Sequence, residues 1–343
     1  MNTKQSNNII PVIHGLVDDM VGENYWFNGC AKYVMECLGE KDYDYVFFAG
    51  LTGDVFTQHY TFTQYYGDGL TSYMMDEKPA QFVEYIFAQC GYAASYVSKK
   101  DLRKNTDLYL HTLIAYIDKG IPVIAWNKFE NPLSVFVGYE DYGKVLLYIT
   151  GNKDQPVRIP LDKALEDRAD IEGWIFVGDK KENRPLADLY REAICAIPQH
   201  LSVKTDTYCF GAEAFRAWAR DIENGKFDGM TIEEFDPWAY YTNYVCVLST
   251  NGCCCYEFLK RARELNPDMD YLVEISALYR RYAEMWGGEN YRNDEDNLEA
   301  IGGGFNITLE ALQDKARRDK IASKIREFAD VTDEIVRVLN ENL

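Results

Sequence analysis

The chain has 343 residues, a formal net charge of −19, and 47% hydrophobic and 14% aromatic residues. That length exceeds the roughly 100–200 residues of one domain, and the apolar content is too high for a disordered chain, so we expect two folded domains. Acidic residues outnumber basic ones in both halves of the chain. No basic surface is therefore expected for nucleic-acid phosphates or an anionic membrane, and neither is a predicted partner.

The distribution of apolar residues and cysteines argues against several further classes of protein. No apolar run approaches the ~18–20 residues of a membrane span, and the start of the chain lacks the pattern of a signal peptide, so a cytoplasmic location is expected. The nine cysteines include no CxxC pair, and three are consecutive, Cys253 to Cys255. Neighbouring side chains on a helix point about 100° apart, so this triplet cannot close on one metal ion. No disulfide framework, metal site or other cofactor is predicted.

Helical and strand patterns alternate over the first 180 residues. A helical apolar period predicts helices over residues 28–38, 78–90 and 108–118, and a glycine follows each of them closely. Asn28 is the expected N-cap of the first helix. Residues 43–64 are aromatic and β-branched and predict mixed strand and loop. Strands are predicted over residues 122–126, 134–139, 144–150 and 174–177, with a hairpin turn at 140–143.

The pattern becomes helical after a charged linker at residues 179–184. Six helices are predicted, over residues 186–196, 212–223, 237–248, 253–265, 271–286 and 309–339, with a break in the last left open. We therefore expect an α+β domain over residues 1–180 and an all-α helical domain over residues 181–343.

One local motif suggests nucleophilic chemistry. The sequence N-Y-W-F-N-G-C-A at residues 24–31 places Cys30 in the first turn of the first predicted helix. Free amide groups and the helix dipole stabilise a thiolate there, which a nearby base would turn into a nucleophile. The side-chain amide of Asn24 could donate to an oxyanion. The alternative is a packed, unreactive cysteine, because Cys30 also begins the apolar stripe of its helix.

Several short motifs in both halves resemble those of a known superfamily. They are Gly29-Cys30-Ala31 with the preceding Asn24, L-T-G-D-V-F at residues 51–56, G-I-P-V-I-A-W at 120–126, V-F-V-G-Y-E-D at 135–141 and G-A-E-A-F-R-A-W at 211–218. They resemble the papain-like cysteine peptidase superfamily, in particular the N-terminal domain of the butirosin-biosynthesis protein H type and the double-glycine leader peptidases. The resemblance implies a bacterial protein whose N-terminal domain packs a central, cysteine-headed helix on an antiparallel sheet.

The chain departs from that superfamily at the catalytic base. The peptidases carry a histidine at or just before the strand that corresponds to residues 135–138, and this chain has Asn131-Pro132-Leu133-Ser134 there. Asn152 would orient an imidazole that this stretch does not supply. Loss of a general base typically costs 10²–10⁴-fold in rate. His59, just beyond the 51–56 loop, is the candidate replacement, and the alternative for it is a strand histidine bonded to a carbonyl.

Aromatic and polar residues near these motifs are candidates for binding a ligand at the junction of the domains, where pockets often form. The candidates are Trp26, Asp54, Phe56, Gln58, Trp126 and Glu130. For any single aromatic residue, core packing is the alternative.

Two functions therefore stay open. The first is thiol-dependent acyl transfer or amide hydrolysis on a small molecule or peptide, with Cys30 as nucleophile, Asn24 as oxyanion donor and His59 as base. The second is a catalytically inactive papain-like protein that binds a small molecule or peptide. A third possible function is a scaffold whose acidic helices dock a partner protein. Formation of a homodimer is also left open.

Overall fold

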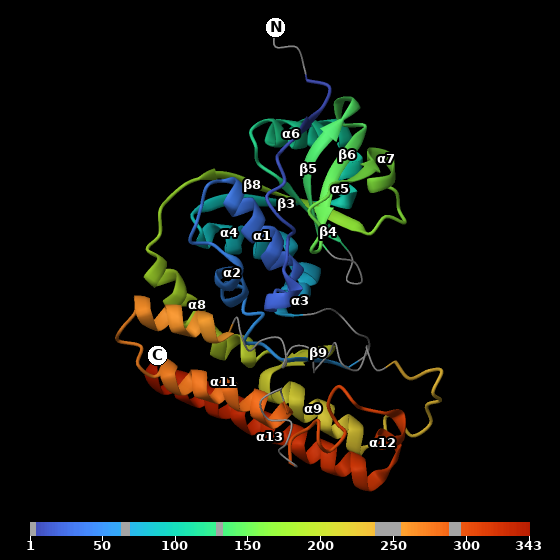
Figure 1. The fold of residues 1–343 in the computed structure, drawn as a ribbon, viewed down its shortest axis with the longest axis vertical. Coiled ribbons are helices and arrows are strands. Elements are labelled where there is room, and N and C mark those ends of the chain that lie inside the picture. Colours follow the sequence, from blue (N-terminus) through green and yellow to red (C-terminus); the bar gives the residue numbers. More distant parts are fainter. Residues whose placement is uncertain (1–4, 63–68, 128–132, 237–254, 288–295) are drawn as a thin grey trace. The chain divides into compact units, whose positions relative to one another are not determined.

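The computed structural model describes residues 5–62, 69–127, 133–236, 255–287 and 296–343. The chain divides into two compact units (Figure 1). Unit 1 comprises Met1–Thr52 and Ser72–Leu189, and unit 2 comprises Gly53–Thr71 and Tyr190–Leu343. The segment Gly53–Thr71 thus groups with the C-terminal half of the chain, although the sequence analysis placed it in the first domain.

Unit 1 is built on an antiparallel sheet. Its strands follow the order β3-β8-β4-β5-β6-β7, and β1 pairs with β5 beside this path. The predicted hairpin is confirmed: β5 and β6 pair from Ser134 opposite Thr150 to Glu140 opposite Val145, and the turn η2 joins them. The elements are β1 (Asn8–Ile9), β3 (Tyr92–Ser98), β4 (Val123–Asn127), β5 (Ser134–Glu140), η2 (Asp141–Gly143), β6 (Val145–Thr150), β7 (Val157–Pro160) and β8 (Ile171–Lys180).

Helices cover this sheet, and its central strands are buried on both faces. Successive side chains of a strand point to opposite faces, and every residue of β5 from Ser134 to Tyr139 is buried. Both α1 and α6 contact β4. The Tyr116 ring of α6 lies 5.3 Å from the Phe176 ring of β8, centroid to centroid. The helices are η1 (Asp19–Val21), α1 (Trp26–Cys37), α2 (Tyr45–Leu51), α3 (Leu70–Glu77), α4 (Pro79–Gln89), α5 (Lys99–Lys104), α6 (Thr106–Asp118), α7 (Leu161–Ala164) and α8 (Leu186–Leu201), the last of which continues into unit 2.

Unit 2 is a helical bundle with a two-stranded sheet. The long helix α13 lies against α9 and α11 (Figure 1). Phe56, from the early segment Gly53–Thr71, lies 5.6 Å from the rings of both Phe258 and Tyr279. This segment therefore supplies part of the core of unit 2. The elements are β2 (His59–Thr61), β9 (Tyr208–Phe210), α9 (Gly211–Glu223), α11 (Leu272–Trp286), α12 (Leu309–Gln313), α13 (Lys315–Asn342) and a helix over residues 255–265.

The α+β class is confirmed in its broad form, because helices combine with an antiparallel sheet. Two local predictions are wrong. Residues 45–51, predicted as strand and loop, form α2, because the Asp44 side chain caps the backbone N–H of Phe47. The C-terminal half is not all-α, because β9 pairs with β2 of the early segment. The helix predicted over residues 237–248 lies outside the described residues.

Candidate functional site

Cys30 lies in the second turn of α1, one turn later than predicted. The helix begins at Trp26 with Tyr25 as its N-cap, so Cys30 is the fifth helical residue. The unsatisfied amide groups of a helix belong to its first turn, and the N–H of Gly29 already donates to the Tyr25 carbonyl at 3.3 Å. Asn28, predicted as the N-cap, is a buried residue inside the helix. The free amide groups expected beside the sulfur therefore lie one turn earlier in the chain, before Cys30.

Residues 15–17, here called the strap, lie directly on α1. Leu16 and Val17 are 0% and 4% exposed. The Leu16 N–H donates to the Gly151 carbonyl at 2.8 Å, which ties the strap to the end of β6. A Cβ atom added to Gly29 would lie 2.4 Å from the Leu16 oxygen and 2.5 Å from Val17 Cγ1. The strap thus covers the helix backbone next to Cys30, and only a glycine at position 29 permits so close an approach.

The Cys30 thiol is sealed from solvent. Its exposed fraction is 0%, and this burial raises the pKa of the thiol above its ordinary value. The thiolate is the nucleophilic form of cysteine, and a raised pKa disfavours that form at neutral pH. Burial and position both favour the packed, unreactive cysteine over the nucleophile.

His14 fastens the strap to α1. Its Nε2 lies 2.6 Å from the Glu36 carboxylate of that helix, and its Nδ1 lies 2.5 Å from the Gly15 carbonyl. The His14 ring also meets the Tyr33 ring edge-on, with 5.6 Å between the centroids. The hydrogen bond to Glu36 raises the pKa of His14, although burial opposes it. This histidine, to which the sequence analysis gave no role, therefore helps to hold the strap on α1.

The other predicted site residues of unit 1 that the structure describes make backbone or packing contacts. Asn24 is half-buried, and its backbone N–H donates to the Gly22 carbonyl at 3.1 Å. The half-buried Trp26 ring lies over Gly151, whose added Cβ atom would be 3.4 Å from it. Trp126 is 6% exposed within β4. Glu130 lies outside the described residues.

The predicted site residues of unit 2 form a buried polar segment. Asp54 is fully buried and accepts hydrogen bonds from the backbone N–H and the hydroxyl of Thr71, at 2.8 and 2.7 Å. Gln58 is 2% exposed, and its Nε2 donates to the Phe56 carbonyl at 3.1 Å. These contacts hold the start of α3 and the approach to β2. The two Asp54 oxygens are thus engaged in structural bonds.

His59 opens β2, where it pairs with Phe210 of β9, and it is 1% exposed. It belongs to unit 2, and Cys30 belongs to unit 1. The Cys30–His59 pair and the ligand pocket at the domain junction stay predictions.

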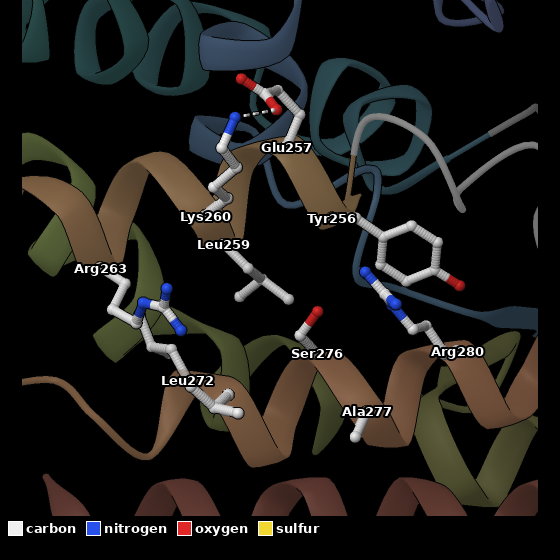
Figure 2. Close-up of a pocket in the computed structure, with 10 residues that line it drawn as sticks. Tyr256, Glu257, Leu259, Lys260, Arg263, Leu272, Ser276, Ala277 and Arg280 are labelled. Carbon is white, nitrogen blue, oxygen red and sulfur yellow. Dashed lines mark hydrogen bonds and ion pairs between the residues drawn. The ribbon is translucent and has the colours of Figure 1, made fainter.

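A hollow that the sequence analysis missed lies within unit 2, between residues 255–265 and α11 (Figure 2). Its volume is about 550 Å³, within the range of small-molecule sites. We call it the hairpin groove. Its lining residues are Tyr256, Glu257, Leu259, Lys260, Arg263, Leu272, Val273, Ser276, Ala277 and Arg280. The signal in the sequence was Lys260 and Arg263 at helical spacing on one helix and Arg280 on the next. These residues form a site only once the two helices pair.

Comparison with models of known protein families and with curated proteins found no match to this chain. Within the described residues, no three histidine, cysteine or acidic side chains are placed to hold a metal ion. No helix in the same part of the chain has both the length and the apolar character to cross a membrane.

Proposed function

We propose that this protein is a papain-like binding protein for a small molecule or short peptide, in which Cys30 serves packing instead of catalysis. The resemblance of its motifs and the contact of the cysteine-bearing helix α1 with an antiparallel sheet support the papain-like class. The observation that supports the loss of catalysis is the complete burial of Cys30, on a helix whose backbone the strap approaches at Gly29.

The chemistry of the buried thiol supports this proposal. A cysteine nucleophile needs a lowered pKa or an adjacent base. Burial shifts the pKa of Cys30 in the opposite direction. Of the two histidines in unit 1, His14 is bound to Glu36 and Gly15, and His111 lies on the exposed side of α6. These observations favour recognition of a ligand over catalysis as the role of a cleft of this class.

Alkylation of the native protein by iodoacetamide, followed by mass spectrometry of each cysteine peptide, tests the proposal. Cys195 is exposed and Cys37 is half-buried, so they provide internal references. We expect Cys30 to react at least about 100-fold more slowly than Cys195, because its reaction requires local opening of the structure. In denaturant the difference between the two sites should disappear.

The Cys30→Ser variant provides the matched control, because it removes the thiol with little change in volume. It should fold and retain ligand binding. If Cys30 in the native protein is instead alkylated faster than Cys195, the binding-only proposal is wrong and thiol-dependent acyl transfer or amide hydrolysis becomes the better assignment.

A further inference from the structure

The hairpin groove is formed by two antiparallel helices. Tyr256 at the start of the first helix donates a hydrogen bond to the Tyr279 carbonyl of α11 at 3.3 Å, and the Arg280 guanidinium lies 5.1 Å from the Tyr256 ring centroid. At the opposite end, Arg263 lines the same hollow as Leu272. From Leu272 to Arg280 the groove therefore extends for about 12 Å, at the ~1.5 Å rise of a helix.

The middle of the groove is apolar. Leu259 in the middle and Leu272 toward the Arg263 end are each 1% exposed and give the groove an apolar lining. Ala277 adds a small side chain, and Ser276 contributes one hydroxyl group. Figure 2 shows Leu259 and Ser276 between Arg263 at one end and Arg280 at the other. An elongated ligand lying along the groove would meet hydrocarbon in its middle.

Both ends of the groove carry cationic side chains. Among the described residues, neither Arg263 nor Arg280 forms an ion pair, whereas Lys260 pairs with Glu257 at 3.4 Å. Unpaired arginines are informative here because the chain holds 55 acidic against 36 basic residues. Elsewhere in unit 2, Arg191 pairs with Asp268. The groove thus has two arginines available for an anion.

We propose that the hairpin groove binds an elongated small molecule with an anionic group at each end and an aliphatic middle. One carboxylate or phosphate is held by Arg263 and the other by Arg280, whose guanidinium the Tyr256 ring supports. Arginine binds such groups through paired charge-assisted hydrogen bonds. The hydrocarbon lies on Leu259 and Leu272. This assignment rests on the proposed binding function and names its ligand class.

Isothermal titration calorimetry with decanedioate tests the two-ended site. Decanoate keeps one charge and decane-1,10-diol keeps none, so the three probes separate the contributions of the ends. We expect decanedioate to bind, decanoate to bind about 10-fold or more weakly, and the diol to show no binding. Equal affinity of decanoate and decanedioate, or no binding of decanedioate, would overturn the proposal.

Substitutions locate the binding. Arg263→Gln and Arg280→Gln should each weaken decanedioate about 10-fold or more while leaving decanoate less affected. Arg281→Gln is the matched control, because Arg281 follows directly on α11 but lines a different hollow. Ala277→Leu fills the middle with the charges intact and should abolish binding. Circular dichroism verifies that each variant folds.

The two proposals fail separately. Absence of decanedioate binding would overturn the ligand class and leave the slow alkylation of Cys30 unchanged. Rapid alkylation of Cys30 would overturn the binding-only function without altering the calorimetry of the groove.

Discussion

Gly29 shows how one residue allows a neighbouring segment to pack directly on a helix. It lies beside Cys30 in α1, and the Leu16 carbonyl oxygen lies only 2.4 Å from where a Cβ atom would be. The G-C pair that resembles a catalytic motif in the sequence therefore has a packing explanation in the structure. The glycine allows the strap to lie on the helix backbone next to the cysteine.

Gly29→Ala should separate the strap from α1. The added methyl group would lie 2.4 Å from a backbone oxygen, so the strap must move. We expect the free energy of unfolding to fall by about 1–3 kcal/mol and the alkylation of Cys30 to become faster. Urea denaturation and the iodoacetamide assay measure the two effects.

Gly178→Ala is the control for that change, because an added Cβ at Gly178 meets only ordinary contacts, the nearest at 3.5 Å. It should change neither the free energy of unfolding nor the rate of Cys30 alkylation. If Gly29→Ala leaves the Cys30 alkylation rate at the wild-type value, the strap is not what protects the thiol.

At this scale, the sequence located the cysteine helix but misplaced its start. Tyr25 caps α1 without any side-chain hydrogen bond, so no Ser, Thr, Asp or Asn marks the boundary. Asn28 offered such a mark three residues too late. The error moved Cys30 into a first turn and gave it an electrostatic environment that it does not have.

At the scale of elements, the strap is held by a contact that depends on pH. His14 joins residues 15–17 to Glu36 of α1, and this hydrogen bond raises the pKa of His14 above its unfolded value near 6.5. A raised pKa means that the folded state binds the proton more tightly. The stabilisation is therefore fully present below about pH 6.5 and is lost as the pH rises through the folded pKa.

His14→Gln should loosen the strap most at low pH. We expect the ratio of Cys30 alkylation rates, variant over wild type, to exceed one at pH 6 and to approach one as the pH rises. Taking the ratio removes the general increase of thiolate with pH. His111→Gln, which changes an exposed residue of α6, should give a ratio of one throughout. A His14→Gln ratio that grows with pH would contradict this mechanism.

Elements with strong local signals were predicted well. The continuous apolar runs of β5 and β6 and the turn between them specify a hairpin. The break that was left open in the last helix occurs at Asp314, between α12 and α13. α2 was missed because its aromatic residues have β propensity, and burial of Phe47 and Phe48 in the core overrides that propensity.

At the scale of the molecule, the grouping of Gly53–Thr71 with unit 2 was beyond the reach of local pattern. Phe56 is separated from Phe258 and Tyr279 by some two hundred residues, and no periodicity reports such a contact. The hairpin groove has the same character, because Arg263 and Arg280 lie on different helices. The sequence allowed the cysteine motif and the C-terminal helices to be predicted. It did not show which helix and segment surfaces pack against one another.

His200 connects this non-local packing to the response of the protein to acid. It lies on α8 against Gly53, where an added Cβ atom would be 2.6 Å from the imidazole Nδ1. That nitrogen is buried and has no hydrogen-bond partner among the described residues. Burial lowers the pKa of His200 to about 4. The folded protein thus holds this imidazole neutral at a pH where the unfolded chain protonates it.

The sign of the effect follows from proton binding. Between pH 6.5 and about 4, the unfolded state binds the His200 proton and the folded state does not, so stability falls as the pH is lowered. A shift from 6.5 to about 4 corresponds to at most about 3 kcal/mol. We expect His200→Gln to lose less stability than wild type between pH 7 and 4.5, as measured by hydrogen exchange in α8 and α9. His111→Gln should behave as wild type. The carboxylates that form ion pairs contribute the same pH dependence of stability to all three proteins. If His200→Gln and wild type show the same dependence on pH, burial does not lower the pKa of His200.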